Sequence, residues 1–150
     1  MTKTPVPDLI LAAARYMLEG QEILQDFSIP ELERIYNGIG PDRFPEKIRD
    51  FVTSVNWLFE PAALIHDVEY WIGGTKEYFT AANDRFRRNC YTIVKAEYGW
   101  YSPLRYHWLF KAWRFSGYCE EFGYEGFHKT DCECHCTRCQ AEAKEKDAEK

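Results

Sequence analysis

The spacing of apolar residues along the chain predicts a series of amphipathic helices. Apolar side chains recur every three or four positions in residues 8–26, and Asp8 can cap the first turn of this helix. Short helices are expected after Pro30 and over residues 46–51. No segment alternates apolar and polar residues for long enough to require a strand. The pattern therefore predicts an all-α (mainly α) fold.

The clearest helical pattern lies on either side of a double glycine. A helix is expected to begin at Glu60-Pro61 and to end at Gly73-Gly74, since proline fits a first helical turn and glycine ends a helix. Thr75 can cap a second helix that continues to about Tyr98, and a third is expected over residues 103–116. The first two helices should pack as a central antiparallel pair.

Composition narrows the class of protein without naming an activity. The chain has 150 residues, of which 45% are hydrophobic and 29% are charged, as in one compact domain. No apolar stretch approaches the roughly 20 residues of a membrane-spanning helix, and no signal peptide is recognisable at the start. We expect an intracellular protein, and export by a signal-independent route remains an alternative.

The middle third of the chain is basic and aromatic. Residues 85–114 contain seven Lys or Arg and one Asp or Glu. The rings and cations are Phe86, Tyr91, Tyr98, Trp100, Tyr101, Tyr106, Trp108, Phe110 and Trp113, with Arg85, Arg87, Arg88, Lys95, Arg105, Lys111 and Arg114. Such a segment can bind a phospholipid surface, and no nucleic acid is expected as a partner. The alternative is that most of these rings form the core.

Four cysteines crowd into eight residues near the end of the chain. They are Cys132, Cys134, Cys136 and Cys139. Reduced thiolates at this spacing favour zinc or an iron–sulfur cluster over disulfides, although two C-x-C steps leave little chain to surround one ion. Cys119, His128 or another subunit can complete the site, and a redox-active tail is the alternative. We therefore expect a helical domain over residues 1–118, a Cys-rich segment over 119–140 and a charged flexible tail over 141–150.

Histidine and carboxylates near the double glycine suggest catalysis. In an antiparallel helix pair joined at Gly73-Gly74, the rise of ~1.5 Å per residue places His66 and Asp84 about 4–5 Å apart along the helix axes. The two side chains can therefore face each other. A carboxylate that orients an imidazole makes it a general base for water. Asp67 points about a quarter turn away, towards the glycine-rich loop 37–41, where oxygen ligands suit Ca²⁺. The rival interpretation of Asp84 is a surface ion pair with Arg88.

Three segments in this order resemble the phospholipase A2 superfamily. They are Asn37-Gly38-Ile39-Gly40-Pro41, His66-Asp67-Val68-Glu69-Tyr70 and Asn83-Asp84-Arg85-Phe86. The spacing is most similar to the disulfide-free members encoded by phages and viruses. The resemblance implies a calcium site formed by loop carbonyls and one carboxylate, at Tyr36, Gly38, Gly40 and Asp67. It also implies His66 as the base, Asp84 as its partner and Tyr70 as a brace for the network.

Two functions from different classes follow from these patterns. The first is a calcium-dependent hydrolase for lipid degradation, encoded by a phage or virus, in which water activated by His66 cleaves a glycerophospholipid acyl ester. The second is a non-enzymatic virion or tail subunit that keeps the fold and uses its cysteine cluster and its basic, aromatic surface for assembly. Both place the protein in the host cytoplasm or in the virion.

Overall fold

The fold is a set of packed helices, as the sequence pattern predicts. The computed structural model describes residues 4–36, 47, 52–53, 56–129 and 136–149. Their elements are α1 (Val6–Arg15), η1 (Gln21–Asp26), α2 (Ile29–Ile35), η2 (Trp57–Phe59), α4 (Glu60–Ile72), α5 (Lys76–Glu97), α6 (Pro103–Phe122), η3 (Gly123–Glu125) and α7 (Thr137–Ala148). Apart from one isolated bridge between Gly74 and Lys129, the described residues contain no β-structure. The all-α fold class is confirmed.

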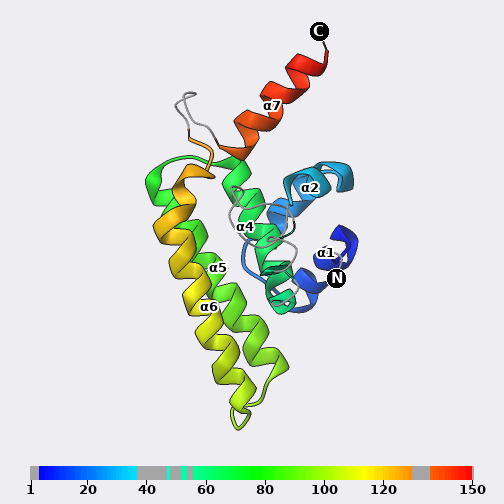
Figure 1. The fold of residues 1–150 in the computed structure, drawn as a ribbon. Coiled ribbons are helices and arrows are strands. Elements are labelled where there is room, and N and C mark those ends of the chain that lie inside the picture. The colour runs from blue at the N-terminus through cyan, green and yellow to red at the C-terminus, as the bar shows by residue number, and fades with distance from the viewer. Residues whose placement is uncertain (1–3, 37–46, 48–51, 54–55, 130–135, 150) are drawn as a thin grey trace.

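Helix α4 lies at the centre of the molecule, between the N-terminal helices and the α5–α6 pair (Figure 1). Most of its residues are buried, including Ala62, Leu64, Ile65 and Val68. A helix that is apolar on nearly all sides belongs in the interior, because burying that surface in one core drives the fold. Polar side chains on this helix are therefore held in a largely dry environment.

Helices α5 and α6 form a long pair that extends well beyond the rest of the molecule (Figure 1). Helix α5 follows its N-cap Thr75 and ends before Gly99, as predicted. Helix α6 starts at Pro103 but continues to Phe122, past the expected end at residue 116 and past the expected domain boundary at residue 118. Gly117 does not stop it, because an isolated glycine only weakens a helix interior.

The first helix is shorter than the predicted range 8–26, because a cap without glycine ends it at Arg15. Met17 adopts a left-handed conformation with φ 51°. Its N–H donates to the Ala14 carbonyl, and the N–H of Leu18 donates to the Ala13 carbonyl, both at 3.0 Å. These two bonds form a Schellman motif, and buried Leu18 supplies its apolar contact. Methionine at this position gives no sequence signal for a helix end.

The C-terminal segment also differs from the prediction. Residues 137–148 form helix α7, where a frayed charged tail was expected, and α7 points away from the helical body (Figure 1). The predicted short helix after Pro30 is present as α2, and Ser28 and Glu31 cap it reciprocally. Of the short helix expected from Pro45 or Glu46 to Phe51, residues 45–46 and 48–51 lie outside the described residues. Among the described helices, none is long and apolar enough to cross a membrane.

Candidate functional site

His66 lies on the inner face of α4 and is only 7% exposed. Its Nε2 atom is 2.9 Å from the side-chain oxygen Oδ1 of Asn83 on α5. The hydroxyl of Tyr70 donates to the same oxygen at 2.7 Å. The rings of Tyr70 and Phe86 pack on the imidazole, with centroid distances of 4.1 and 4.8 Å. His66 and Tyr70 therefore share one helix face and one hydrogen-bond partner.

The partners of Asn83 determine which nitrogen of His66 carries the proton. The Asn83 amide nitrogen donates to Glu120 Oε2 at 2.7 Å, and a carboxylate accepts without donating. The amide oxygen must therefore face His66 and Tyr70. Because this oxygen can only accept, His66 carries its proton on Nε2 and presents the lone pair of Nδ1. We call these four side chains, His66, Tyr70, Asn83 and Glu120, the His66 network.

Burial controls the protonation of His66 and Tyr70. It lowers the pKa of His66 to about 4, and the hydrogen bond to Asn83 opposes the change only in part. Burial also raises the pKa of Tyr70 well above its usual range. At neutral pH the imidazole is therefore neutral and the phenol is a permanent donor. This is the protonation that a general base and its brace require.

The expected pairing of His66 with Asp84 is wrong, because Asn83 occupies that place. The Asp84 side chain is 44% exposed, and its Oδ1 accepts from Arg87 at 2.6 Å. Counting residues from the turn fixes the axial level of a helical side chain but not its direction, and neighbouring residues differ by about 100°. The rival interpretation, an ion pair with Arg88, is also not observed: Arg88 pairs with Glu19 at 2.9 Å.

Asp67 lies beside the imidazole, and its side chain is only partly exposed. One of its oxygens is 3.9 Å from Nδ1 of His66. Burial raises the pKa of Tyr36, and the nearby charge of Glu60 adds to the shift. The buried hydroxyl of Tyr36 donates to Glu60 at 2.9 Å. Gly38 and Gly40 lie outside the described residues, so calcium at this position stays a prediction.

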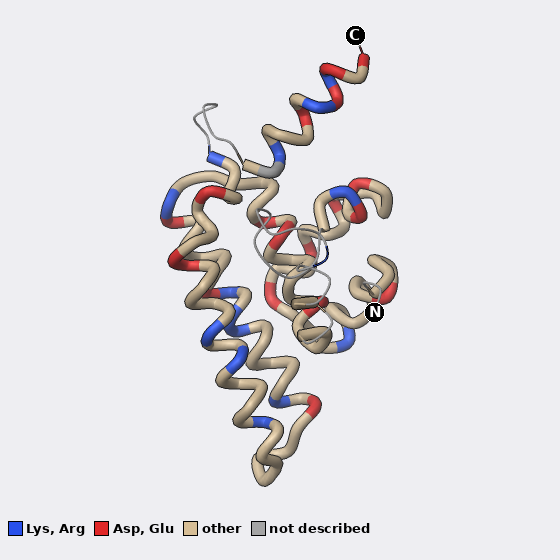
Figure 2. Tube along the Cα trace, in the orientation of Figure 1, with Lys and Arg blue, Asp and Glu red and all other residues tan. Residues whose placement is uncertain are grey.

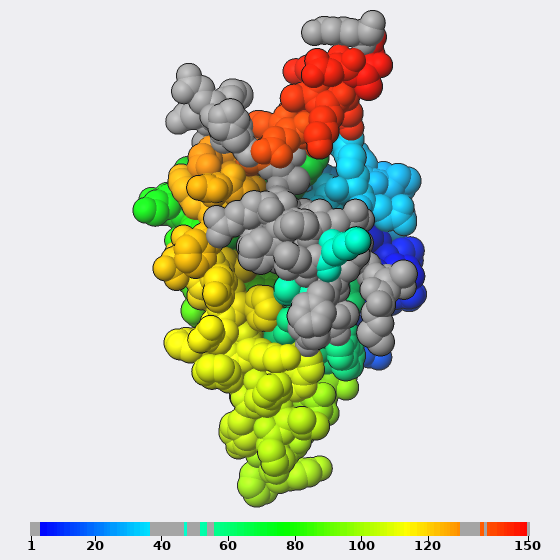
Figure 3. All heavy atoms as spheres, viewed as in Figure 1, coloured from blue at the N-terminus to red at the C-terminus, as the bar shows by residue number. Residues whose placement is uncertain are grey.

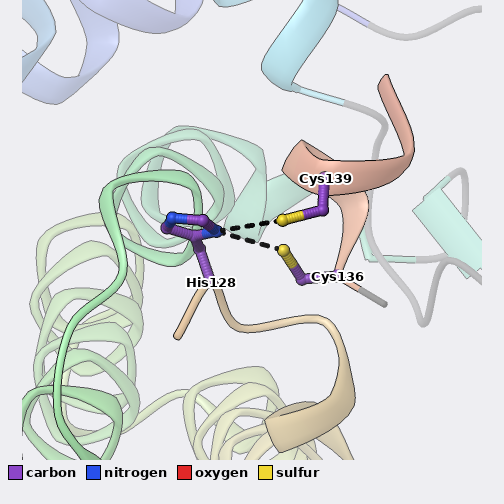
Figure 4. A group of neighbouring side chains, drawn as sticks. All are labelled: His128, Cys136 and Cys139. Atoms are coloured by element: carbon purple, nitrogen blue, oxygen red, sulfur yellow. Dashed lines mark hydrogen bonds between the residues drawn. The ribbon is translucent and has the colours of Figure 1, made fainter. Parts of the chain in front are cut away.

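A second polar cluster lies at the start of α7 (Figure 4). Nδ1 of His128 is 3.3 Å from Sγ of Cys136 and 3.6 Å from Sγ of Cys139. All three ligand atoms lie within 4.8 Å of one another, and the group could hold a metal ion. Cys132 and Cys134 lie outside the described residues. We call His128, Cys136 and Cys139 the thiolate site.

The local fold explains why these three side chains meet. Cys136 is the N-cap residue of α7 and Cys139 lies in its first turn, which is the C-x-x-C spacing of many zinc ligands. A helix N-terminus favours negative charge and therefore thiolates. His128 is presented by the segment that follows η3. The sequence suggested His128 only as one of several ligands that could complete the cluster.

The sequence interpretation missed Asn83 and Glu120. Asn83 lies four residues after Phe79 and three before Phe86, and all three face the core. A polar residue in register with buried aromatic rings was the signal that could have identified it. Glu120 gave no such signal, because it lies in the part of α6 beyond the predicted end of that helix.

Comparisons with protein-family models, with curated proteins and with solved structures found no match for this chain.

Proposed function

We propose that the chain is a calcium-dependent lipid ester hydrolase of the phospholipase A2 type, encoded by a phage or virus. The observation that carries this proposal is the fixed tautomer of His66. Asn83 accepts the Nε2 proton, and Glu120 sets the direction of the Asn83 amide. The lone pair of Nδ1 then faces the side of the helix where Asp67 lies. Fixing a tautomer in this way is what an orienting partner does for a catalytic histidine.

The reaction follows from this arrangement. Nδ1 of His66 takes a proton from water, the oxygen of that water attacks the ester carbonyl, and the imidazolium returns the proton to the leaving alcohol. Asn83 holds the ring throughout, but it adds no negative charge, so it stabilises the imidazolium less than a carboxylate would. Asp67 is the described carboxylate that would hold Ca²⁺, and the bound cation would polarise the carbonyl.

The outer surface of α5 and α6 supports a lipid surface as the partner. Tyr106, Phe110 and Trp113 follow one another at helical spacing on α6 and are all exposed. Trp100 and Tyr101, at the tip between the helices, are 75% and 77% exposed. The alternative was that most aromatic rings of residues 85–114 form the core. These five rings do not, because they are exposed. Figure 2 shows that the charges on the half of the α5–α6 pair nearer to its tip are mostly cationic. Figure 3 shows that α6 lies on the surface of the molecule.

Exposed aromatic rings beside cations are typical of proteins that bind at the interface of anionic membranes. We expect salt-sensitive adsorption to anionic vesicles, and Arg114→Glu should weaken it because Arg114 is exposed beside Trp113. Lys146→Glu, the same charge change on α7, is the matched control. Equal loss in both variants would show that only net charge matters, and no adsorption at low salt would remove the lipid surface from the proposal.

The activity is tested by fatty-acid release from phospholipid vesicles. We expect release with Ca²⁺ and none in excess chelator. His66→Ala should lower the rate by roughly 10²–10⁴-fold, the usual contribution of a general base. His107→Ala is the matched control, because His107 is exposed on α6. Equal rates in wild type and His66→Ala would rule out His66 as the base.

One observation favours the second candidate, a non-enzymatic virion or tail subunit. His66 is almost fully buried, and its partner is an uncharged amide, as in a network that only stabilises a helix pair. On this alternative, the protein releases no fatty acid from any phospholipid, and His66→Ala lowers stability alone. Turnover that depends on His66 excludes this alternative.

A further inference from the structure

We propose that His128, Cys136 and Cys139 bind one Zn²⁺ ion, and that this ion fastens α7 to the C-terminal end of α4. The role is structural and does not depend on the proposed hydrolase activity. Three sets of observations carry it: the distances from His128 to the two sulfurs, the attachment of His128 to α4, and the absence of a buried side chain among the described side chains of α7.

The imidazole nitrogen of His128 lies at the distances from both sulfurs that a zinc site requires. A tetrahedral site with Zn–S bonds of about 2.3 Å and Zn–N bonds of about 2.0 Å places an imidazole nitrogen roughly 3.5 Å from each sulfur. The observed separations from Nδ1 of His128 are 3.3 Å to Cys136 and 3.6 Å to Cys139. Figure 4 shows that one ring nitrogen of His128 points at both sulfurs. The three ligand atoms also lie within 4.8 Å of one another, so an ion can bind all three after small movements of these side chains.

The chemistry of the donors selects the metal. Two sulfurs and one imidazole nitrogen suit Zn²⁺, whereas Ca²⁺ prefers oxygen ligands. Iron–sulfur clusters are most often held by four cysteines, so the imidazole among the described ligands favours zinc. The burial of Cys136 and the partial burial of Cys139 and His128 limit access of water to the ion.

His128 is fixed to the end of α4 through its backbone. Its N–H donates to the carbonyl of Tyr70 at 3.0 Å, and its own carbonyl accepts from the N–H of Gly74 at 2.9 Å. The chain approaches so closely that a Cβ atom on Gly73 would lie 1.9 Å from the His128 carbonyl oxygen. The double glycine therefore does more than end the helix, because it makes room for the segment that carries the ligand.

In the described part of the chain, helix α7 packs only loosely on the helical body. None of its side chains with described burial is buried. Its contacts with other elements include Arg138, which donates to the Trp71 carbonyl at 3.4 Å, and an ion pair of Glu145 with Arg34. The ion pair of Arg34 with Glu145 is exposed and contributes little, because water and salt compete with such pairs. Coordination through Cys136 and Cys139 would join the first turn of α7 to α4 by way of His128.

The test is a zinc titration of the full-length chain, prepared metal-free under reducing conditions, against a chromophoric chelator. We expect one tightly bound Zn²⁺ per chain, and Co²⁺ in its place should give the intense sulfur-to-metal absorption of a thiolate site. Cys136→Ser with Cys139→Ser should abolish both signals, and His128→Asn should weaken binding. Cys119→Ser is the matched control, because Cys119 is not part of the group.

Hydrogen exchange of residues 138–148 measures the fastening of α7 directly. Zinc should slow exchange there in the wild type and in Cys119→Ser, but not in the double-serine variant. This comparison holds even if the variant has lost stability, because each protein is measured with and without zinc. Unchanged zinc content in the double-serine variant would overturn the proposed ligands. Iron with brown absorbance would overturn zinc, and exchange that does not respond to bound zinc would overturn the fastening of α7.

Discussion

The His66 network and the thiolate site are built in opposite ways. The His66 network joins three helices, α4, α5 and α6, and aromatic rings pack around its imidazole. The thiolate site joins a loop to the first turn of a helix that has no described buried side chain. Burial of the imidazole therefore orders the first cluster, whereas in the second cluster Cys136 is buried but His128 and Cys139 are only partly buried. The properties of the first should follow from desolvation, and those of the second from the ion.

The two clusters meet at Tyr70. Its hydroxyl belongs to the His66 network, and its carbonyl accepts from the N–H of His128 in the thiolate site. The ring of Phe127 packs edge-on against the ring of Tyr70, with a centroid distance of 5.4 Å. A change at either cluster can therefore reach the other through one residue. Substitutions at each cluster can show where the two are independent and where they are coupled.

The largest effect is expected at Gly73, where the thiolate site is attached to α4. Gly73 has φ 71°, and a Cβ atom would meet the His128 carbonyl at 1.9 Å. Gly73→Ala should lower the free energy of unfolding by at least about 3 kcal/mol, because a strained backbone and a steric clash add together. It should also weaken zinc binding. Urea denaturation and the zinc titration measure the two effects.

Gly117 provides the control for this substitution. It lies inside α6, and a Cβ atom there would meet nothing within 4 Å. Gly117→Ala should raise the free energy of unfolding by roughly 0.5–1 kcal/mol, because alanine loses less backbone entropy in a helix. Zinc binding should not change. Similar losses of stability in both variants would mean that the close approach at Gly73 does not matter.

The next largest effect is a loss of stability in acid that, of the two clusters, is expected from the His66 network alone. The unfolded chain protonates His66 near its ordinary pKa of about 6.5, whereas the folded chain does so only near pH 4. Between these values the proton binds the unfolded state preferentially. Stability should fall by about 3 kcal/mol as the pH falls from 6.5 to 4, with no contribution from this group above that range.

His66→Gln isolates this contribution, because glutamine can donate to Asn83 but does not titrate in this range. Other acid-sensitive groups act alike in both proteins, so the difference between the two stability curves belongs to His66. Urea denaturation at several pH values gives both curves. Parallel curves between pH 6.5 and 4 would show that His66 titrates normally in the folded protein.

A smaller effect is expected when the negative charge of the network is moved from position 120 to position 83, next to the imidazole. In the double variant Asn83→Asp with Glu120→Gln, an amide can still donate to the side chain at position 83, so the bonds of the network are kept. A carboxylate that accepts from His66 favours the imidazolium. The pKa of His66, followed by NMR, should rise from about 4 towards its ordinary value. If the protein is a hydrolase, its rate should rise as well, whereas an unchanged pKa would contradict the tautomer assignment.

The sequence predicted the helices better than it predicted what they bring together. Apolar periodicity and the Gly73-Gly74 turn predicted the central helix pair. Both signals can be read from neighbouring residues, because the apolar face of a helix and the conformation of glycine depend on the local sequence. The site depends on rotation about the helix axis, and there Asn83 displaced Asp84. In the thiolate site, the C-x-x-C spacing of Cys136 and Cys139 was visible in the sequence. The place of His128 was not, since it depends on a close approach between segments distant in the chain.

The smallest effect should come from the ion pair that links α7 to α2. Arg34 contacts Glu145, and its guanidinium also lies 5.3 Å from the ring centroid of Trp71. With zinc bound, Arg34→Ala should lower the free energy of unfolding by less than about 1 kcal/mol, as is usual for exposed pairs. Without zinc, the same substitution should speed hydrogen exchange in residues 138–148 much more, because the remaining contacts of α7 are weak. If Arg34→Ala has the same effect on exchange with and without zinc, coordination adds nothing to the docking of α7, and the contrast between the two clusters fails at that point.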